Sequence, residues 1–467
     1  MLSALYKKVI GGFVSTVFAA GVVLTAVPAM QVGAAESDTF TYDFTVGGSQ
    51  YVRDMIEQEY GAEYVPLYQD MVNKLAAQTL SDDDFGSSVD ITYNVGDDIL
   101  PSDANNTKLK NLAMLAMYDE PQLYWLDGYG ISWSSRFYTL MFNPEAAYKS
   151  ASARAAANNA IVSTLSEYHE LLEGKKGTFF KLAALNDALA DATKYDLNVK
   201  NSDRYNILGC LRDNLCVCDG YAKSFELIAN VEGIADTVRV FNSTHAWNAV
   251  SFNDSWYYID VTFDDVIVNN VDYPNSEFWR RFFLKSVADF DAQDSKHLNP
   301  DRLYSTFDRP EISPVSYVYK ESINIKVPDG FDKGTCSYDI KRTDSGYSNT
   351  ETKSLNDWTL DFTGVSDGTY QMTFYSANTV PFDVETEVKY GVPTQPLEIK
   401  LNLIGDPNGD GKVNASDLLM VKSDIKGVSK LNGYSRKCAD ITGDNNLNAS
   451  DLLRIKAHIK GVSSLWK

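Results

Sequence analysis

Two copies of a twelve-residue loop, Asp406–Asp417 and Asp440–Asp451, constrain the fold of this chain more than any other feature. Each copy places oxygen-bearing side chains at loop positions 1, 3, 5, 9 and 12. Position 6 is Gly411 or Asn445, the residue types that best tolerate the left-handed backbone of a sharp turn. An apolar pattern of helical spacing follows each loop. The sequence therefore predicts two loop-plus-helix units that each surround a hard cation with oxygen atoms.

The spacing is that of an EF-hand loop, so we expect two calcium ions. The predicted ligands are Asp406, Asn408, Asp410, Lys412, Asn414 and Asp417 in the first loop, and Asp440, Thr442, Asp444, Asn446, Asn448 and Asp451 in the second. The second site is expected to be the weaker one, because the hydroxyl of Thr442 is a poorer ligand than a carboxylate or an amide. Acidic surface turns without a metal are the alternative.

This pair of half EF-hands, residues 404–467, resembles a dockerin, the module that attaches a secreted enzyme to a cohesin domain of a cellulosome-type scaffold protein. The resemblance implies that cohesin contacts the loop positions just before the last ligand. These positions hold Ala415 and Ser416 in the first copy and Ala449 and Ser450 in the second. Their identity in the two copies predicts two near-equivalent binding faces.

The N-terminal sequence predicts export. Lys7 and Lys8 precede an uncharged run from Val9 to Met30, and small residues follow, so residues 1–35 are expected to be a signal peptide. The predicted location is extracellular, on a bacterial cell surface or scaffold. An uncleaved anchor, which would add the membrane as a partner, is the alternative. The net charge of −21 argues against nucleic acid as a partner.

Cys218 has the surroundings of a reactive thiol. Apolar residues recur at helical spacing from Tyr221 to Ile228, so a helix is expected to begin near Cys218. A thiol at a helix N-terminus is favoured as the nucleophilic thiolate, and free backbone N–H groups there can hold an oxyanion. Three of the five cysteines crowd this segment, and a bridge between Cys210 and Cys216 is left open.

A nucleophilic cysteine needs a base, and His245 is the candidate among four histidines. The other three lie in less suggestive settings: His169 in a helical stretch, His297 in a polar loop and His458 on the last helix. Residues 243–252 and 255–263 are aromatic and β-branched runs that flank a two-residue turn, which predicts a hairpin.

The register of that hairpin decides the neighbours of His245. If Phe252 pairs with Ser255, Trp247 lies opposite Asp260, and His245 and Asp260 share one face of the sheet. The alternative is that the cysteine and the histidine only fill the core, as isolated residues of these types usually do.

Three segments, Cys218–Ala222, His245–Asn248 and Trp256–Thr262, resemble the transglutaminase-like superfamily in type and order. The resemblance extends from about Thr178 to Asp265 and departs from the common pattern at Val261, where proline is usual. It implies an α+β, papain/transglutaminase-like fold. Cys218 would be the nucleophile, His245 the base and acid, and Asp260 the orienting carboxylate.

The resemblance implies a peptidase or transamidase that acts on a protein or peptide through a thioester. A catalytically inert fold that binds peptide or glycan is the alternative. Asp264 and Asp265 are expected to be solvated turn residues.

The sequence predicts four regions after the signal peptide. They are a helical, aromatic-rich region at 36–174, the catalytic domain at 175–310, a small antiparallel Ig-like β-sandwich at 311–403 that serves as a spacer or binding module, and the dockerin at 404–467. Aromatic residues of the first region are expected to form core, with substrate binding as the alternative; they are Tyr124, Trp125, Tyr129 and Trp133.

Overall fold

The computed structural model describes most of the chain beyond residue 39. The described residues are 40–265, 267–268, 271–272, 280–304, 307–322, 324–326, 336–344, 350–355, 359–361, 368–389 and 392–465. The predicted signal peptide lies outside them. Across the described ranges, every helix is too short or too polar to span a lipid bilayer. The chain divides into two compact units, one that ends at Tyr317 and one that begins at Val318.

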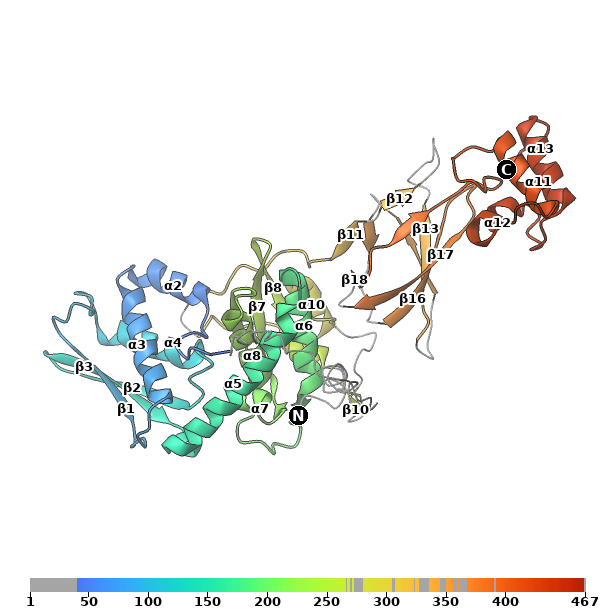
Figure 1. Ribbon diagram of the computed structural model, residues 1–467. Helices are drawn as coiled ribbons and strands as arrows, with labels where there is room; N and C mark the ends of the chain where they lie inside the picture. Colours follow the sequence, from blue (N-terminus) through green and yellow to red (C-terminus); the bar gives the residue numbers. More distant parts are fainter. Residues whose placement is uncertain are drawn as a thin grey trace, which may run out of the picture. The chain divides into compact units, whose positions relative to one another are not determined.

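Unit 1 combines helices with small sheets (Figure 1). Its helices are α2 (Gln50–Tyr60), α3 (Tyr64–Thr79), α4 (Asn106–Tyr118), η1 (Ala146–Tyr148), α5 (Ala151–Glu173), α6 (Thr178–Ala192), α7 (Ile207–Leu211), α8 (Cys218–Val231), α9 (Val261–Asp264), α10 (Val287–Gln293) and η2 (Ser295–His297). Its strands are β1 (Val89–Asn94), β2 (Leu126–Trp133), β3 (Phe137–Pro144), β4 (Lys194–Tyr195), β5 (Leu215–Cys216), β6 (Thr237–Phe241), β7 (Ala246–Phe252), β8 (Ser255–Ile259), β9 (Ile267–Val268) and β10 (Val271–Asp272).

The N-terminal part of unit 1 packs α3 and α4 against the antiparallel sheet β1–β3–β2. Two of its helices begin where polar side chains accept hydrogen bonds from free backbone N–H groups: Ser49 caps α2 and Asn105 caps α4. Tyr124 and Trp125 are buried core residues, as the sequence predicts, whereas Trp133 is 58% exposed. Aromatic residues therefore mainly hold this region together.

The sheet β6–β7–β8 and the helix α8 carry the candidate site. The strands are antiparallel, and Phe252 pairs with Ser255, which confirms the predicted register. Helix α8 begins at Cys218, as predicted, and packs on β6 and β7 through an apolar face that contains Tyr221, Phe225 and Ile228. The N-terminus of a buried helix is thereby fixed close to the start of β7.

Unit 2 contains the remaining strands and the C-terminal helices. The strands are β11 (Lys320–Ser322), β12 (Asn324–Lys326), β13 (Ser337–Arg342), β14 (Thr350–Ser354), β15 (Thr359–Asp361), β16 (Gly368–Tyr375), β17 (Phe382–Lys389), β18 (Val392–Pro393) and β19 (Glu398–Lys400). The helices are α11 (Ala415–Ile425), α12 (Gly433–Ala439) and α13 (Ala449–Ile459).

The strands of unit 2 enclose their own apolar core. A five-stranded antiparallel sheet runs in the order β14–β13–β16–β17–β18, beside the antiparallel pair β11–β15 and the parallel pair β12–β19. The parallel pair departs from the all-antiparallel arrangement that the sequence predicts. The core includes Tyr338, Met372 and Phe374 on the inward faces of the strands.

Two repeated helices dominate the C-terminal part of unit 2. Each follows one of the duplicated loops, and each begins with a capping box in which an Asn and an Asp exchange hydrogen bonds with the backbone. Val421, Ala439 and Ile455 form the small core beneath the helices. The predicted loop-plus-helix units are therefore present in both copies.

Candidate functional site

Cys218 is the first residue of α8 and is partly exposed, whereas the other four cysteines are buried. Gly220 lets the first turn of α8 pack closely against Arg204 and Cys216. A Cβ at this position would come within 2.7 Å of the Arg204 carbonyl oxygen and of Cys216 Cβ. All five cysteines are free thiols, so no bridge joins Cys210 to Cys216. The two side chains are instead hydrogen-bond partners in the core.

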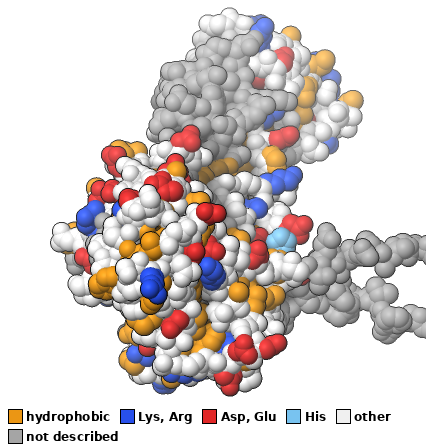
Figure 2. Space-filling view, turned by 90° about the vertical axis from the view of Figure 1, so that its left-hand side faces the viewer, with side chains coloured by type: hydrophobic (Ala, Val, Ile, Leu, Met, Phe, Trp, Pro, Cys, Tyr) orange, Lys and Arg blue, Asp and Glu red, His pale blue; other side chains and the backbone are white. Residues whose placement is uncertain are grey.

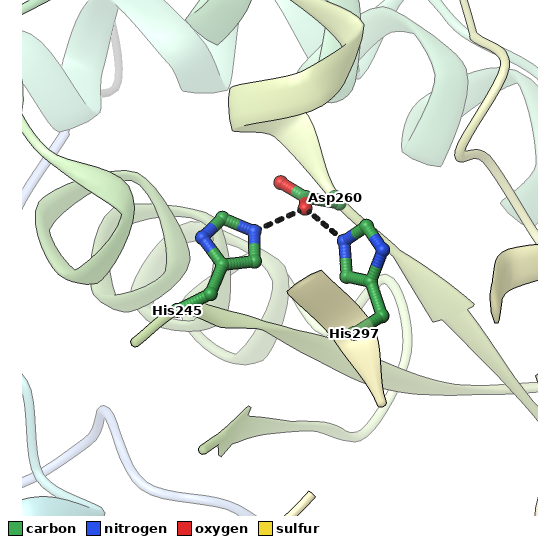
Figure 3. A group of neighbouring side chains, drawn as sticks. All are labelled: His245, Asp260 and His297. Atoms are coloured by element: carbon green, nitrogen blue, oxygen red, sulfur yellow. Dashed lines mark hydrogen bonds and ion pairs between the residues drawn. The ribbon is translucent and has the colours of Figure 1, made fainter. Parts of the chain in front are cut away.

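His245 lies at the entrance of β7, where its backbone N–H donates to Asn242 Oδ1 at 3.0 Å. Its ring stacks on Trp247 and contacts Phe263 edge-on. The ring nitrogen Nε2 donates to Asp260 Oδ2 at 2.6 Å (Figure 3). Cys218 lies near enough to raise the pKa of His245 through hydrogen bonding and charge, so the histidine interacts with both the cysteine and the carboxylate.

The buried site perturbs both groups of the His245–Asp260 pair. Burial alone would lower the pKa of His245, but the Asp260 carboxylate outweighs it, with a further contribution from Cys218, and raises that pKa to about 10. Burial would raise the pKa of Asp260, but hydrogen bonds and positive charge from His245 and His297 lower it to about 2. His245 is therefore held as an imidazolium against an ionised carboxylate at neutral pH.

The strand that carries Asp260 is shorter than the sequence predicts. Strand β8 ends at Ile259, and Val261–Asp264 forms the short helix α9 instead of continuing the strand to residue 263. Asp260 causes the change, because its Oδ1 accepts from Phe263 N–H and caps α9. The expected pairing of Trp247 with Asp260 is absent from the strand register, yet the Asp260 side chain reaches His245.

His297 was wrongly predicted to lie in a polar loop. Its side chain is buried, and its Nε2 donates to the same oxygen of Asp260, Oδ2, at 2.7 Å (Figure 3). The residue is separated from Asp260 by 37 positions in the sequence, and its neighbours in the chain are polar. No periodic pattern of the local sequence marks it as buried.

Two aspartates after Asp260 are also buried, contrary to the prediction that they are solvated. Asp264 accepts from the backbone N–H of Phe282 at 2.8 Å, and burial raises its pKa well above the usual range. Asp265 accepts from the Tyr221 hydroxyl at 2.7 Å. The two carboxyls tie α9 to its neighbours.

Tyr195 is a further neighbour of the thiol. Burial and its hydrogen-bonded contact with Cys218 raise the pKa of the Tyr195 phenol to about 12. Its hydroxyl therefore keeps its proton near the sulfur.

The first duplicated loop gathers carboxylates around one point. Ligand atoms of Asp406, Asp410 and Asp417 lie within 4.8 Å of one another, and the turn is completed by Gly411 at a φ of +85°. Asp417 Oδ2 accepts from the backbone N–H of Asn414, whereas the buried Oδ1 has no hydrogen-bond partner among the described residues. Burial raises the pKa of Asp417 to about 6. A buried carboxylate oxygen without a donor fits a cation ligand.

The second loop is arranged differently. Asn445 takes the left-handed conformation at a φ of +62°, as predicted for position 6. Asp451 Oδ1 accepts from both the backbone N–H and the hydroxyl of Thr442, each at 3.0 Å. The corresponding oxygen of the first loop makes no hydrogen bond of normal geometry, although the backbone N–H of Asn408 approaches that carboxylate. In the described chain, the three acidic groups of the second loop are not gathered as closely as those of the first.

The predicted cohesin-contacting residues lie on the surface of both copies. They are exposed at the first turn of each helix and comprise Ala415, Ser416, Ala449 and Ser450. Leu419 and Leu453, at matching positions one turn further on, are 64% and 61% exposed. The two copies thus present similar surfaces.

Comparison with known proteins identifies one domain. Residues 404–460 match the model of the dockerin type I domain, so the chain contains this domain within the predicted range 404–467. Dockerin domains bind cohesin domains in cellulosome-type complexes, and type I dockerins bind calcium.

The similarity found among solved structures is weak. A solved structure described as "Crystal structure of a TGase" is similar at 12% identity and a TM-score of 0.22, over 44% of this chain and 60% of that one. A similarity this low carries no argument about the fold or the activity. The comparison with curated proteins finds no match.

Proposed function

We propose that this protein is a secreted thiol enzyme that cleaves or transfers amide bonds through a thioester while its dockerin holds it on a scaffold. The observation that carries the proposal is the connected series Cys218, His245 and Asp260. The partly exposed Cys218 begins a helix and interacts with the His245 imidazolium. The imidazolium donates a hydrogen bond to the buried Asp260 carboxylate at 2.6 Å. This is the arrangement that thiol acyl transfer requires.

The reaction begins when Cys218 Sγ attacks the carbonyl carbon of a carboxamide or peptide bond. Backbone N–H groups at the start of α8 are positioned to hold the resulting oxyanion. The C–N bond then breaks as the His245 imidazolium gives its proton to the departing amine, and a thioester is left on Cys218. Asp260 keeps the imidazole ring oriented throughout.

The second half-reaction decides the type of enzyme. Neutral His245 takes a proton from water or from an incoming amine, which attacks the thioester carbon, and the C–S bond breaks to return the thiolate. Water as the acceptor gives a peptidase or amidase, and an amine gives a transamidase. The substrate is a protein or peptide in either case.

Calcium belongs to the docking function in this proposal. The two loops would hold two ions through the residues predicted from the sequence, with Asp417 Oδ1 and Asp451 Oδ1 at the last ligand position. The ions fix the loop conformation and so present the exposed residues of each copy to cohesin. Two similar surfaces support docking in either of two orientations.

The distribution of surface charge agrees with an extracellular role. Figure 2 shows acidic side chains spread over the visible face of the molecule, with Lys and Arg scattered among them. Together with the net charge of −21, this surface disfavours a polyanionic partner. Residues 1–35 would serve as the signal peptide.

Trapping of the thioester with a library of activity-based peptide probes tests the proposed chemistry. The wild-type protein is expected to form a covalent adduct on Cys218, and Cys218→Ala is expected to form none. Cys336→Ala, which removes a buried thiol of unit 2, is the matched control and should react like the wild type. Equal adduct formation by Cys218→Ala and the wild type would refute the assignment.

A further inference from the structure

His297 occupies a position that the proposed reaction has not yet used. It ends the short helix η2, and its side chain has no exposed surface. Aromatic rings surround it: the ring centroid of Phe290 lies 4.1 Å away, that of Phe263 5.0 Å and that of Trp247 5.3 Å. A polar ring in such surroundings requires partners for both of its nitrogens.

Both partners are hydrogen-bond acceptors. His297 Nε2 faces Asp260 Oδ2 at 2.7 Å, and His297 Nδ1 faces the backbone carbonyl of Asp294 at 3.2 Å. Because the Asp260 carboxylate can only accept, Nε2 of His297 is the donor in this hydrogen bond. This donor faces the carboxylate that also serves His245.

Both oxygens of the Asp260 carboxylate therefore accept hydrogen bonds. Its Oδ2 accepts from His245 and His297, and its Oδ1 accepts from the Phe263 backbone N–H at 3.2 Å. Figure 3 shows the carboxylate between the two rings, with both dashed lines meeting at one oxygen. With one ring on each side, the carboxylate is restrained from turning away from His245.

His245, Asp260 and His297 are spaced for direct hydrogen bonds and not for a bound metal ion. Their ligand atoms lie within 4.8 Å of one another, but a zinc ion between them would need bonds of about 2.0–2.2 Å to each atom. Nitrogen-to-oxygen distances of 2.6 and 2.7 Å leave no such space.

We propose that His297 is a positioning residue for the proposed thiol reaction: it holds the Asp260 carboxylate from the side opposite His245 and so fixes the orientation of the catalytic imidazole. The inference rests on the proposed function, because it assigns His297 a role at the same site.

Two charged side chains lie near His297 among the described residues of unit 1. Asp291 on α10 interacts with it electrostatically, and the Lys296 ammonium lies 5.3 Å from the ring centroid of Phe263, a ring that His297 also contacts. Asp260 and His245 are titratable groups in direct contact with its ring.

Two substitutions separate positioning from packing. His297→Phe keeps an aromatic ring but removes the N–H donor to Asp260, whereas His297→Gln keeps an N–H donor for that carboxylate. His169→Gln is the matched control, because His169 is also paired with a carboxylate, Glu232, at 2.9 Å but lies on α5 with a side chain that is 43% exposed.

The rate of Cys218 alkylation by iodoacetamide, measured against pH, is the readout, because it requires no substrate. His297→Phe should slow alkylation at neutral pH by roughly 10- to 100-fold, the equivalent of one hydrogen bond to a charged group. His297→Gln should recover much of that rate, because its amide N–H can still hold the Asp260 carboxylate. His169→Gln should match the wild type.

Other outcomes separate the two proposals. If His297→Phe reacts like the wild type, or if His297→Gln is as slow as His297→Phe, the positioning role is wrong even where thioester trapping succeeds. If the predicted alkylation pattern appears but no peptide probe forms a thioester, the proposed function is wrong and the role of His297 stands. Thermal unfolding of each variant checks folding, and His297→Leu, which also lacks the N–H donor, takes the place of His297→Phe if that variant does not fold.

Discussion

Asp260 of unit 1 and Asp417 of unit 2 are both buried carboxylates, with exposed fractions of 1% and 0%, but their surroundings differ. Asp260 receives N–H donors from two histidines and one backbone amide, and its pKa is lowered to about 2. Asp417 has one oxygen without a donor, and burial raises its pKa to about 6. The protein itself satisfies the first carboxylate, whereas the second is arranged for a cation.

Burial alone therefore does not determine what an acidic group does. A buried carboxylate that is fully hydrogen-bonded can stay ionised and orient a neighbouring base. One that is left incomplete is costly until a metal ion completes it, so its site is linked to calcium. Each site should therefore respond to a treatment that leaves the other unchanged.

The largest effect is expected from Asp260→Asn. The amide cannot accept from His245 and His297 as the carboxylate does, so turnover in thioester formation should fall by roughly 10³- to 10⁴-fold. Cohesin binding should be unchanged. Asp417→Asn is the reciprocal control and should keep full turnover. Substantial activity in Asp260→Asn would show that the carboxylate does not orient His245.

Calcium removal should affect the dockerin and leave unit 1 unchanged. With free calcium at a hundredfold excess over its dissociation constant, binding stabilises the folded module by about 2.7 kcal/mol, and this stabilisation disappears in excess EDTA. Circular dichroism and cohesin pull-down should show loss of structure and of docking, while alkylation of Cys218 continues at its original rate. Unchanged cohesin binding in EDTA would contradict the account.

A smaller effect should distinguish the two calcium loops. Thr442→Asn gives the second loop the residue that the first has at Asn408, and removes the hydroxyl that donates to Asp451. Calcium should then bind the second loop more tightly by about 1 kcal/mol, or roughly fivefold. Asn408→Thr should weaken the first loop, and isothermal titration calorimetry measures both. Equal calcium affinities in the wild type, Thr442→Asn and Asn408→Thr would show that this position does not distinguish the two loops.

The smallest effect concerns the pH dependence of stability. Folding raises the pKa of Asp417, so the calcium-free dockerin should lose stability as pH rises from about 4 to about 6, with a fall of a few degrees in its thermal midpoint. Asp260 should have the opposite effect on the pH dependence of stability. Its stabilising contribution is present above about pH 4 and is lost as pH falls through about 2. A midpoint that rises between pH 4 and 6 in EDTA would contradict the assignment for Asp417.

Local sequence patterns predicted several features of the fold. The helix that starts at Cys218 follows from apolar residues at helical spacing, and the pairing of Phe252 with Ser255 follows from the two-residue turn between them. The left-handed residues Gly411 and Asn445 follow from the loop pattern. Each of these features depends on neighbours in the chain, so a single sequence contains the necessary information.

Long-range contacts were less predictable. His297 reaches Asp260 across 37 positions, and its polar neighbours conceal its burial. The helical turn after Asp260 replaces a β-branched strand pattern because one side chain caps it. The catalytic roles of Cys218, His245 and Asp260 remain predictions that the spatial arrangement supports.

Selective alkylation of the native protein near neutral pH tests the central claim most directly. The account predicts that iodoacetamide modifies one cysteine, Cys218, much faster than the four buried thiols, and that His245→Ala abolishes this preference without changing the folded structure. Mass spectrometry locates the adduct. A Cys218 that reacts no faster than an ordinary exposed thiol, or that reacts equally well in His245→Ala, would contradict a thiol activated by that imidazole.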